Sequence, residues 1–318
     1  MRLVAVSTVK NESDIVEAFV RHTASIVDHH LIVDNGSTDA TREILNALVS
    51  EGVALRVFDD ASPGAWHARR LTRLMHEAAS EHAADWVIPL DADEFVVTRR
   101  PRAIRRALKK SSSPVIVPWQ TYVPDDSDDA GEPNPVRRIC HRVAAEGHRW
   151  VKVMVPGELA TVGQLHQGSH DVSLPSDMAT DRTLLEGVRL AHFPVRSVAQ
   201  FARKVAIGKI QYLARDEAKG LAFHYEEPFS RLLQSWEDFA AGYWDAAARF
   251  ALPPGTAFEP VLVRDPIGYR GGSLRYTPPP RPGEPWVTIL EYTMQLAAEV
   301  RRQWSGLDAD RVPTRGAE

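Results

Sequence analysis

Four short apolar runs, separated by three segments with helical spacing, follow one another along the first part of the chain. The runs occupy residues 3–6, 31–33, 54–58 and 86–90. Between the first two, apolar side chains recur at steps of three and four residues from Ile15 to Val27, the spacing of one buried helix face. A longer helix is expected over residues 65–84. Continuous apolar strands separated by helices predict an α/β fold in which helices cover both faces of a mostly parallel sheet.

Polar segments follow three of these expected strands at the point where each strand ends. They are residues 7–12, 34–39 and 91–94. Ligands of open parallel sheets bind outside the carboxyl ends of the strands, where such segments meet. The sequence therefore predicts one ligand site built from the three segments together.

The third segment places Asp91 and Asp93 one residue apart, directly after an apolar run. Alternate side chains at a strand end point the same way, so both carboxylates can approach one cation while small Ala92 points away. Hard cations such as Mg²⁺ and Mn²⁺ prefer carboxylate oxygens. The same spacing recurs at residues 126–128 and 308–310, but no apolar strand precedes either pair. Capping of a following helix is the structural alternative for Asp91 and Asp93.

Composition narrows the classes of protein. The chain has 318 residues, enough for one large domain or for a domain with an appendage. A net charge of −4 gives no overall basic field and argues against nucleic acid as a partner. The one cysteine, Cys140, excludes an internal disulfide and a cysteine metal cluster. The first apolar run meets Lys10 and Glu12 too early for a signal peptide, and no run approaches the ~20 apolar residues of a membrane span, so a cytoplasmic location is expected.

Three blocks of the sequence carry a resemblance to a known family. They are VKNESDIVEAFVRHT, HHLIVDNGSTDATREIL and DWVIPLDADEF, in this order. Together they resemble the family 2 glycosyltransferases of the GT-A fold, in particular a bacterial branch whose metal motif is followed by Glu-Phe. Residues 190–204 resemble the stretch that closes that catalytic domain. The resemblance covers residues 2–210 and implies a catalytic domain over residues 1–220.

The resemblance implies a nucleotide-sugar donor held at the ends of the first two strands. Thr8 and Val9 would contact it through backbone groups. Asp34 and Asp39 would contact it through carboxylates, which accept hydrogen bonds from a pyrimidine N–H or a ribose hydroxyl. An Asx-turn is the structural alternative for Asp34, and a charge in the first turn of a helix is the alternative for Asp39. The full set expected to bind the donor is Thr8, Val9, Glu12, Asp34, Asn35, Asp39, Asp91, Ala92 and Lys204.

The resemblance also implies Mn²⁺ or Mg²⁺ as cofactor. Asp93 would ligate the metal that bridges the two phosphates, and Asp91 would join it as a ligand or face the ribose or a metal-bound water. His192 would complete the metal shell, because neutral imidazole is a competent ligand for Mn²⁺. A packed core histidine is the alternative for His192. Lys204 and Arg203 would pair with the diphosphate, with a solvated helix face as the alternative for Arg203.

Inversion of the anomeric centre requires a base that takes the acceptor's proton. The acidic pair that family 2 enzymes often place after the metal motif has no clear counterpart here. Asp171 is the first candidate, and His170 is expected to act as a base or to contact the acceptor. The other candidates are Glu158, Asp181, Glu226 and Glu227.

Beyond residue 220 the pattern changes to aromatic-rich helical segments, a stretch rich in proline and glycine, and an amphipathic helix. Residues 221–318 are therefore expected to form a helical extension that reads the acceptor, makes a homodimer contact or only packs. Residues 307–318 are expected to form a disordered tail. Residues 120–150 are expected to form a long polar loop over the site, an acceptor loop or lid.

The sequence is thus interpreted as a metal-dependent glycosyltransferase that moves a sugar from a nucleoside diphosphate to an acceptor hydroxyl, with inversion. The acceptor stays open among a polysaccharide, a lipid-linked glycan and a small molecule. A non-catalytic sugar-nucleotide-binding protein is one alternative on the same fold. A sugar-1-phosphate nucleotidyltransferase is another, although the Gly-rich basic loop it needs after the first strand is missing. A nicotinamide enzyme would need G-x-G-x-x-G there, and this motif is missing too.

Overall fold

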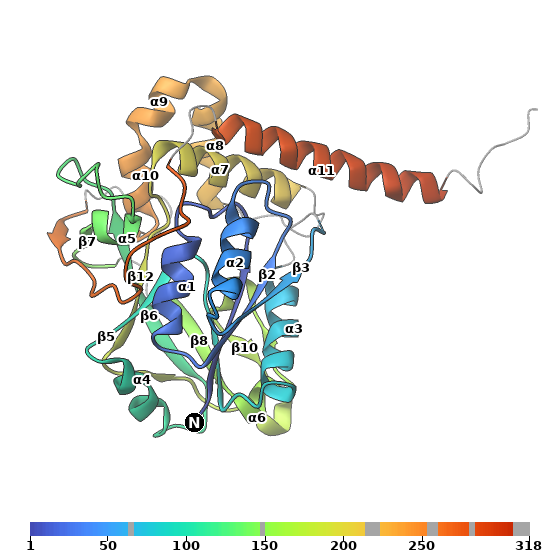
Figure 1. Ribbon diagram of the computed structural model, residues 1–318, viewed down its shortest axis with the longest axis vertical. Helices are drawn as coiled ribbons and strands as arrows, with labels where there is room; N and C mark the ends of the chain where they lie inside the picture. Colours follow the sequence, from blue (N-terminus) through green and yellow to red (C-terminus); the bar gives the residue numbers. More distant parts are fainter. Residues whose placement is uncertain (63–66, 147–149, 214–222, 253–259, 280–283, 308–318) are drawn as a thin grey trace, which may run out of the picture.

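The computed structural model describes residues 1–62, 67–146, 150–213, 223–252, 260–279 and 284–307. Within these residues eleven strands form one sheet, and helices pack on both of its faces (Figure 1). The α/β fold class expected from the sequence is confirmed. None of the described helices is long and apolar enough to span a membrane.

The first four strands form the parallel half of the sheet. They are β1 (Leu3–Val9), β2 (His29–Asp34), β3 (Leu55–Asp59) and β4 (Trp86–Pro89). Their spatial order is β3-β2-β1-β4, and each neighbouring pair is parallel. Their carboxyl ends therefore meet at one edge of the sheet, which brings together the three polar segments found in the sequence.

Helices cover both faces of this half. On one face lie α1 (Val16–Ala24), α2 (Thr41–Ser50) and α4 (Pro101–Leu108), and on the other lie α3 (His67–Ser80) and α6 (Gly157–Ala160). Helix α3 ends at Ser80, before residue 84 where the sequence predicted its end, while residues 65 and 66 of the expected helix lie outside the described residues.

Strand β1 shows why its sequence is an uninterrupted apolar run. Leu3 and Ala5 belong to the core beneath α1 and α2, whereas Val4 and Val6 belong to the core beneath α3. All four side chains are fully buried. A parallel strand that is covered on both faces has no solvent side and so shows no alternation of apolar and polar residues.

Antiparallel strands extend the sheet beyond β4. Strand β8 (Val151–Pro156) pairs antiparallel with β4, and β6 (Val115–Val123) pairs antiparallel with β8. Strand β12 (Val188–His192) lies parallel to β6 and antiparallel to β5 (Glu94–Thr98). In this register His192 lies opposite Glu94, which places it beside the two aspartates that precede β5.

The remaining strands are short. They are β7 (His141–Val143), β9 (Gln164–Leu165), β10 (Val172–Ser173), β11 (Thr183–Leu184) and β13 (Leu262–Arg264), with single 3₁₀ turns at η1 (Gln167–Ser169) and η2 (Ser176–Met178). Residues 120–150 hold more regular structure than the long loop expected from the sequence. They contain the end of β6, the short helix α5 (Pro135–Arg138) and β7, while residues 147–149 lie outside the described residues.

The helical C-terminal region expected from the sequence is confirmed. After α7 (Val198–Leu213) come α8 (Phe223–Gln234), α9 (Trp236–Ala241), α10 (Tyr243–Arg249) and α11 (Glu284–Leu307). Helix α11 begins beside the other C-terminal helices and then extends away from the sheet (Figure 1). The expected tail beyond residue 307 lies outside the described residues.

The chain after residue 220 also returns to the sheet formed by the preceding residues. Strand β13 pairs antiparallel with β7 and so adds to the main sheet. Tyr122 Oη donates a hydrogen bond of 2.6 Å to the carbonyl of Asp265. Glu17 on α1 accepts hydrogen bonds from the backbone N–H groups of Arg275, Tyr276 and Thr277. The segments before and after residue 220 therefore contribute strands to the same sheet and form hydrogen bonds with each other.

Candidate active site

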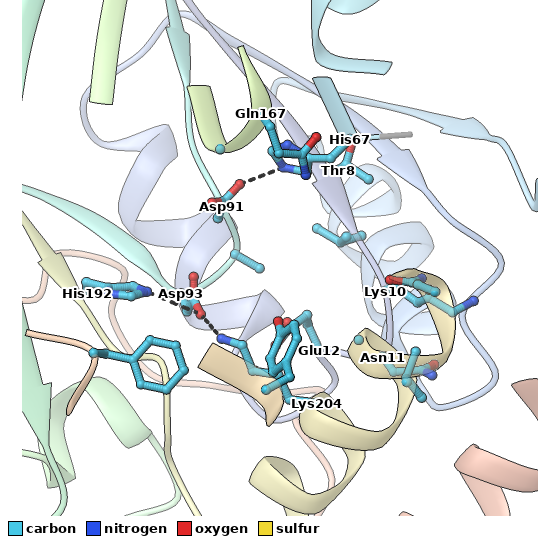
Figure 2. Close-up of a pocket in the computed structure, with 18 of the residues that line it drawn as sticks. Thr8, Lys10, Asn11, Glu12, His67, Asp91, Asp93, Gln167, His192 and Lys204 are labelled. Atoms are coloured by element: carbon cyan, nitrogen blue, oxygen red, sulfur yellow. Dashed lines mark hydrogen bonds and ion pairs between the residues drawn. The ribbon is translucent and has the colours of Figure 1, made fainter. Parts of the chain in front are cut away.

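A cavity of about 550 Å³ lies at the carboxyl edge of the parallel strands (Figure 2). Its walls come from the segments after β1, β2 and β4, the first turns of α3, the η1 turn, the end of β12, α7 and the end of α10. Eleven of the residues singled out in the sequence line it: Thr8, Val9, Glu12, Asn35, Asp91, Ala92, Asp93, His170, His192, Arg203 and Lys204. Asp34, Asp39, Glu158 and Asp171 are not among the lining residues.

Asp91 lies between a histidine and a buried lysine. His67 Nε2 is 2.9 Å from Asp91 Oδ1, and Lys152 Nζ donates a hydrogen bond of 2.6 Å to Asp91 Oδ2. Burial raises the pKa of Asp91, but the charges of Lys152 and His67 outweigh burial and hold this pKa well below its usual range. Asp91 is therefore ionised at neutral pH.

Asp93 lies beside a lysine from α7 and a histidine from β12. Lys204 Nζ donates a hydrogen bond of 2.6 Å to Asp93 Oδ2, and His192 Nε2 lies 3.7 Å from the same oxygen. Burial raises the pKa of Asp93, whereas Lys204, His192 and Arg196 lower it and prevail. Figure 2 shows the side chains of Lys204 and His192 converging on Asp93 from two sides.

Sequence reasoning missed Lys152. This residue lies in β8, is fully buried, and donates a hydrogen bond of 2.8 Å to the carbonyl of Gly168 in addition to its bond with Asp91. Its Nζ also lies 3.2 Å from Glu94 Oε1. Burial lowers the pKa of Lys152, but Asp91 and Glu94 raise it above the usual value. The available signal was a lysine inside the apolar run VKVMVP, since lysine is almost never fully buried unless it is paired.

The ends of β1 and β2 are joined by side chain to backbone contacts. Lys10 Nζ donates to the carbonyls of Asn35, at 2.7 Å, and Gly36, at 3.0 Å. The Asn35 amide donates to the carbonyl of Asp60 at 2.6 Å. Burial lowers the pKa of Lys10 to about 8, with Asp34 acting in the opposite direction. These contacts fix the part of the cavity wall formed by Thr8 to Glu12.

Asp34 and Asp39 hold neighbouring backbone. Asp34 Oδ1 accepts hydrogen bonds from Ser37 N at 3.0 Å and Ser37 Oγ at 2.6 Å. Asp39 accepts from Ser13 N at 3.1 Å and from Thr41 N at 3.0 Å, next to the start of α2. These are the Asx-turn and first-turn arrangements weighed as structural alternatives. Direct contact of either carboxylate with a nucleotide stays a prediction.

Basic side chains outnumber carboxylates in the cavity wall. The basic ones are Lys10, Arg70, Arg203, Lys204 and Arg249, and the carboxylates are Glu12, Asp91 and Asp93. Burial raises the pKa of Glu12 to about 7, although Arg196, which pairs with it, acts to lower this pKa. The excess of positive charge makes the cavity suited to an anionic ligand.

His192 is a neutral imidazole at the inner end of the cavity. Burial lowers its pKa to about 4, with Asp93 acting in the opposite direction. Its Nδ1 is buried and has no hydrogen-bond partner among the described residues. The ring lies 4.3 Å from the ring of Trp119, measured between centroids. A neutral imidazole beside an ionised carboxylate is a donor pair that can share one divalent cation.

Among the predicted catalytic residues, His170 alone lines the cavity. Asp171 Oδ1 accepts a hydrogen bond of 2.7 Å from Arg182 Nε, so the loop holds this carboxylate against Arg182. Glu158 is exposed on α6, which Figure 1 shows at the end of the sheet opposite the C-terminal helices. Asp181 and residues 226–227 are exposed too and do not line the cavity.

Residues 5–155 match the family model described as Glycosyl transferase family 2. The matched stretch runs from β1 into β8 and contains Asp91, Asp93 and Lys152. These residues therefore belong to glycosyl transferase family 2, and the sheet they form with its covering helices is that of the GT-A fold. No curated protein matches the sequence.

Three solved structures overlap with the chain at low identity. S. aureus TarS is 11% identical with a TM-score of 0.37, over 74% of this chain and 44% of that one. The mannosyltransferase PcManGT from Pyrobaculum calidifontis, in complex with GDP-Man and Mn²⁺, is 16% identical with a TM-score of 0.38, over 96% of this chain and 87% of that one. Glucosyl-3-phosphoglycerate synthase from Mycobacterium tuberculosis is 14% identical with a TM-score of 0.32, over 66% of this chain and 79% of that one. Sequence identities and TM-scores this low do not indicate the function of this chain.

Proposed function

We propose that the protein is a metal-dependent glycosyltransferase that moves a sugar from a nucleoside diphosphate to an acceptor hydroxyl, with inversion at the anomeric carbon. One observation carries this proposal. In a family 2 domain, Asp91 and Asp93 line the same cavity as the basic residues Arg203, Lys204 and Arg249. That arrangement suits a ligand with two phosphates and a neutral part that reaches toward the strand ends.

The nucleoside belongs at the ends of β1 and β2 in this proposal. Thr8, Val9, Asn11 and Asn35 line that part of the cavity. Asn11 itself is tied down, because its Oδ1 accepts a hydrogen bond of 2.8 Å from Thr38 N. Backbone groups of such a braced wall can hold a planar base without the cost of ordering a flexible loop.

The diphosphate belongs between Asp93 and α7. Lys204 is the basic group nearest to Asp93, and Arg203 lies beside it on the same helix. Arg203 Nη1 is 3.6 Å from Asp39 Oδ2, so its guanidinium is already oriented by a carboxylate. Hydrogen bonds from ammonium and guanidinium groups to phosphate oxygens are about twice as strong as neutral ones.

The residues at Asp93 fit a divalent cation that also takes ligands from phosphate and water. Asp93 Oδ2 and His192 Nε2 lie 3.7 Å apart, Asp93 is ionised and His192 is neutral. No group of three His, Cys, Asp or Glu side chains that could hold a metal occurs in the described part of the chain. Mg²⁺ sites in nucleotide enzymes usually have one or two protein carboxylates, with substrate phosphates and water completing the shell. A bound metal would supply Lewis-acid charge to the departing diphosphate.

The chain's own groups have separate tasks in this reaction. Lys204 and Arg203 stabilise negative charge on the leaving diphosphate. Asp91, fixed by Lys152 and His67, presents an ionised carboxylate toward the donor. Because Lys152 is fully buried, this carboxylate keeps one orientation while the donor binds and leaves.

A thermal-shift panel tests the proposal. UDP, GDP, dTDP and CDP are each added with Mn²⁺ or with chelator, because a ligand that binds only the native state raises the melting temperature. We expect a shift for one nucleotide that depends on Mn²⁺, and turnover of the matching nucleotide sugar. Asp93→Asn should abolish that turnover, while Asp59→Asn, at a side chain that is 75% exposed on β3, should not change it. No shift with any nucleotide, or full turnover in Asp93→Asn, would refute the proposal.

A non-catalytic sugar-nucleotide-binding protein is the second candidate. It would give the same metal-dependent shift, since binding and turnover use the same groups. Release of the nucleoside diphosphate from the matching sugar donor separates the two, because a binding protein leaves the donor intact.

A further inference from the structure

An aromatic wall forms part of the cavity lining. It consists of Trp119 in the middle of β6, Trp150 just before β8, and His170 just after η1, all three of which line the cavity. The His170 ring lies 5.0 Å from the ring of Trp150 and 5.3 Å from that of Trp119, measured between centroids. The two indoles lie 6.2 Å apart. The nucleotide and metal assignments above leave this wall unused.

The wall lies on the side of Asp93 away from the ends of β1 and β2. The Trp119 ring is 4.3 Å from His192, whose Nε2 is 3.7 Å from Asp93. In Figure 2 His192 and Asp93 lie on one side of the cavity, and Lys10 and Asn11 lie on the other. A ligand with its nucleoside near Lys10 and its phosphates near Asp93 would thus point the group beyond the phosphates toward the aromatic wall.

His170 is held in one tautomer. Its Nδ1 lies 2.7 Å from the backbone carbonyl of Val151, a group that can only accept, so Nδ1 carries the proton. Nε2 therefore has the lone pair. Gly168 permits this position, because a Cβ at residue 168 would lie 2.5 Å from His170 Nε2, and its φ of +71° also favours glycine.

The other bases in the cavity wall are each engaged by a neighbouring group. Glu12 pairs with Arg196, Asp91 with Lys152 and Asp93 with Lys204. His67 lies against Asp91 at 2.9 Å, and His192 lies beside Asp93. Among the cavity-lining residues that the structure describes, His170 thus combines a fixed lone pair with a place next to two indoles.

We propose that Trp119, Trp150 and His170 form the acceptor subsite, that the acceptor is a sugar whose apolar ring face packs on the indoles, and that His170 Nε2 takes the proton of its attacking hydroxyl. This inference rests on the proposed glycosyl transfer and names its acceptor class and base. Indole rings offer flat apolar area with little loss of side-chain entropy, which suits the C–H face of a pyranose.

In the proposed step, the acceptor oxygen forms a bond to the anomeric carbon of the donor sugar while the bond from that carbon to the phosphate oxygen breaks. The hydroxyl proton moves to His170 Nε2, and the electron pair of the broken bond leaves with the nucleoside diphosphate. Because Nδ1 keeps its proton on the Val151 carbonyl, His170 becomes an imidazolium and later returns the proton to water.

The test uses the full-length protein and the nucleotide sugar identified by the thermal-shift panel. Two rates are measured: donor hydrolysis, with water as acceptor, and transfer to methyl glycosides of glucose, galactose, mannose and N-acetylglucosamine. His170→Ala should lower both rates by about 100-fold or more, the usual contribution of a general base. His166→Ala is the matched control, since His166 is exposed, contacts Ser173 and does not line the cavity. It should keep both rates.

Trp150→Ala tests whether the aromatic wall binds the acceptor sugar. The variant's ratio of transfer to hydrolysis should fall by about tenfold, because a sugar acceptor loses its packing surface whereas water needs none. Trp236→Ala, at a partly exposed indole on α9 outside the cavity, should keep the wild-type ratio. The nucleotide-induced thermal shift of each variant shows that the donor site is intact.

Three results would overturn the inference: His170→Ala with wild-type rates, Trp150→Ala with a wild-type ratio, or wild-type protein that hydrolyses the donor but transfers to none of the glycosides. Loss of both rates in Asp171→Asn to the level of His170→Ala would also overturn it, by returning the base to Asp171. Failure of the proposed function looks different, because then the wild-type protein neither binds nor hydrolyses any donor.

Discussion

Lys204 Nζ lies 2.6 Å from Asp93 Oδ2, so an ammonium group from α7 neutralises the carboxylate that was expected to ligate the metal. Both groups line the cavity, and Asp93 is almost completely buried. A divalent cation that binds Asp93 has to compete with this ammonium. Once displaced, Lys204 is in position to bind a phosphate oxygen of the donor.

Lys204→Met should therefore change metal and nucleotide binding in opposite directions. Without the competing ammonium, Mn²⁺ should bind more tightly in the absence of nucleotide. The nucleoside diphosphate should bind about 10- to 100-fold more weakly, because a charge-assisted hydrogen bond worth about 1.5–3 kcal/mol is lost. Isothermal titration calorimetry measures both affinities. Lys209→Met is the control, since Lys209 lies on the same helix and pairs with exposed Glu226. Equal Mn²⁺ affinity in wild type and Lys204→Met would contradict competition at Asp93.

Lys152→Met should destabilise the fold strongly. Lys152 is fully buried and pairs with the partly buried Asp91 and the fully buried Glu94, so its removal leaves the ionised Asp91 without its counter-charge. Removing one partner of a buried ion pair costs about 3–5 kcal/mol. Urea unfolding monitored by circular dichroism gives the change in unfolding free energy. Lys209→Met, at a pair with an exposed partner, should cost less than about 1 kcal/mol. Similar costs for the two variants would show that Lys152 is not an essential counter-charge.

Gly157 allows a close approach between two chain segments. A Cβ at this residue would lie 1.9 Å from the carbonyl oxygen of Ala84, which is backbone and has little freedom to shift. Gly157→Ala should thus cost about 1–3 kcal/mol through overpacking. Gly268→Ala adds the same methyl group where no atom lies within 4 Å, and it should leave the melting temperature nearly unchanged. Equal melting temperatures for both variants would be the contrary result.

The sequence predicted those features of the fold that depend on local pattern. Apolar runs separated by helical spacing define β1 to β4, and the carboxyl ends of parallel strands necessarily meet, so the positions of Thr8, Asn35 and Asp93 in one cavity followed from topology. The contact between Lys152 and Asp91 did not follow, because it joins residues 61 positions apart across an antiparallel pairing that no local pattern announces.

The candidate base also depends on long-range contacts that the sequence pattern does not predict. His170 and Asp171 are neighbours, and both are chemically able to take a proton. Which of them faces the cavity is decided by contacts far along the chain, those of His170 with Val151 and of Asp171 with Arg182. Sequence reasoning therefore named both residues but placed Asp171, which does not line the cavity, ahead of His170, which does.

Glu17 joins α1 to the chain segment that follows β13. Its side chain is fully buried and accepts hydrogen bonds from Arg275 N at 2.7 Å, Tyr276 N at 2.8 Å and Thr277 N at 2.9 Å. Arg21 Nε donates a further bond of 2.9 Å. Burial raises the pKa of Glu17, but these hydrogen bonds prevail and lower it below its usual value. The ionised carboxylate is thus the form that holds the C-terminal segment.

The lowered pKa of Glu17 predicts how stability depends on pH. A carboxyl group whose folded-state pKa is depressed stabilises the fold fully above its unfolded-state pKa of 4.5, and this stabilisation is lost as the pH falls from there through the folded-state pKa. Glu17→Gln should lower the unfolding free energy by about 1.5–3 kcal/mol at pH 7 and by less at pH 3.5, because the carboxyl group of the unfolded wild-type chain is then mostly protonated, so unfolding takes up a proton. Denaturant unfolding at both pH values measures the two differences. A difference that stays the same at both pH values would mean that the charge of Glu17 does not hold the segment.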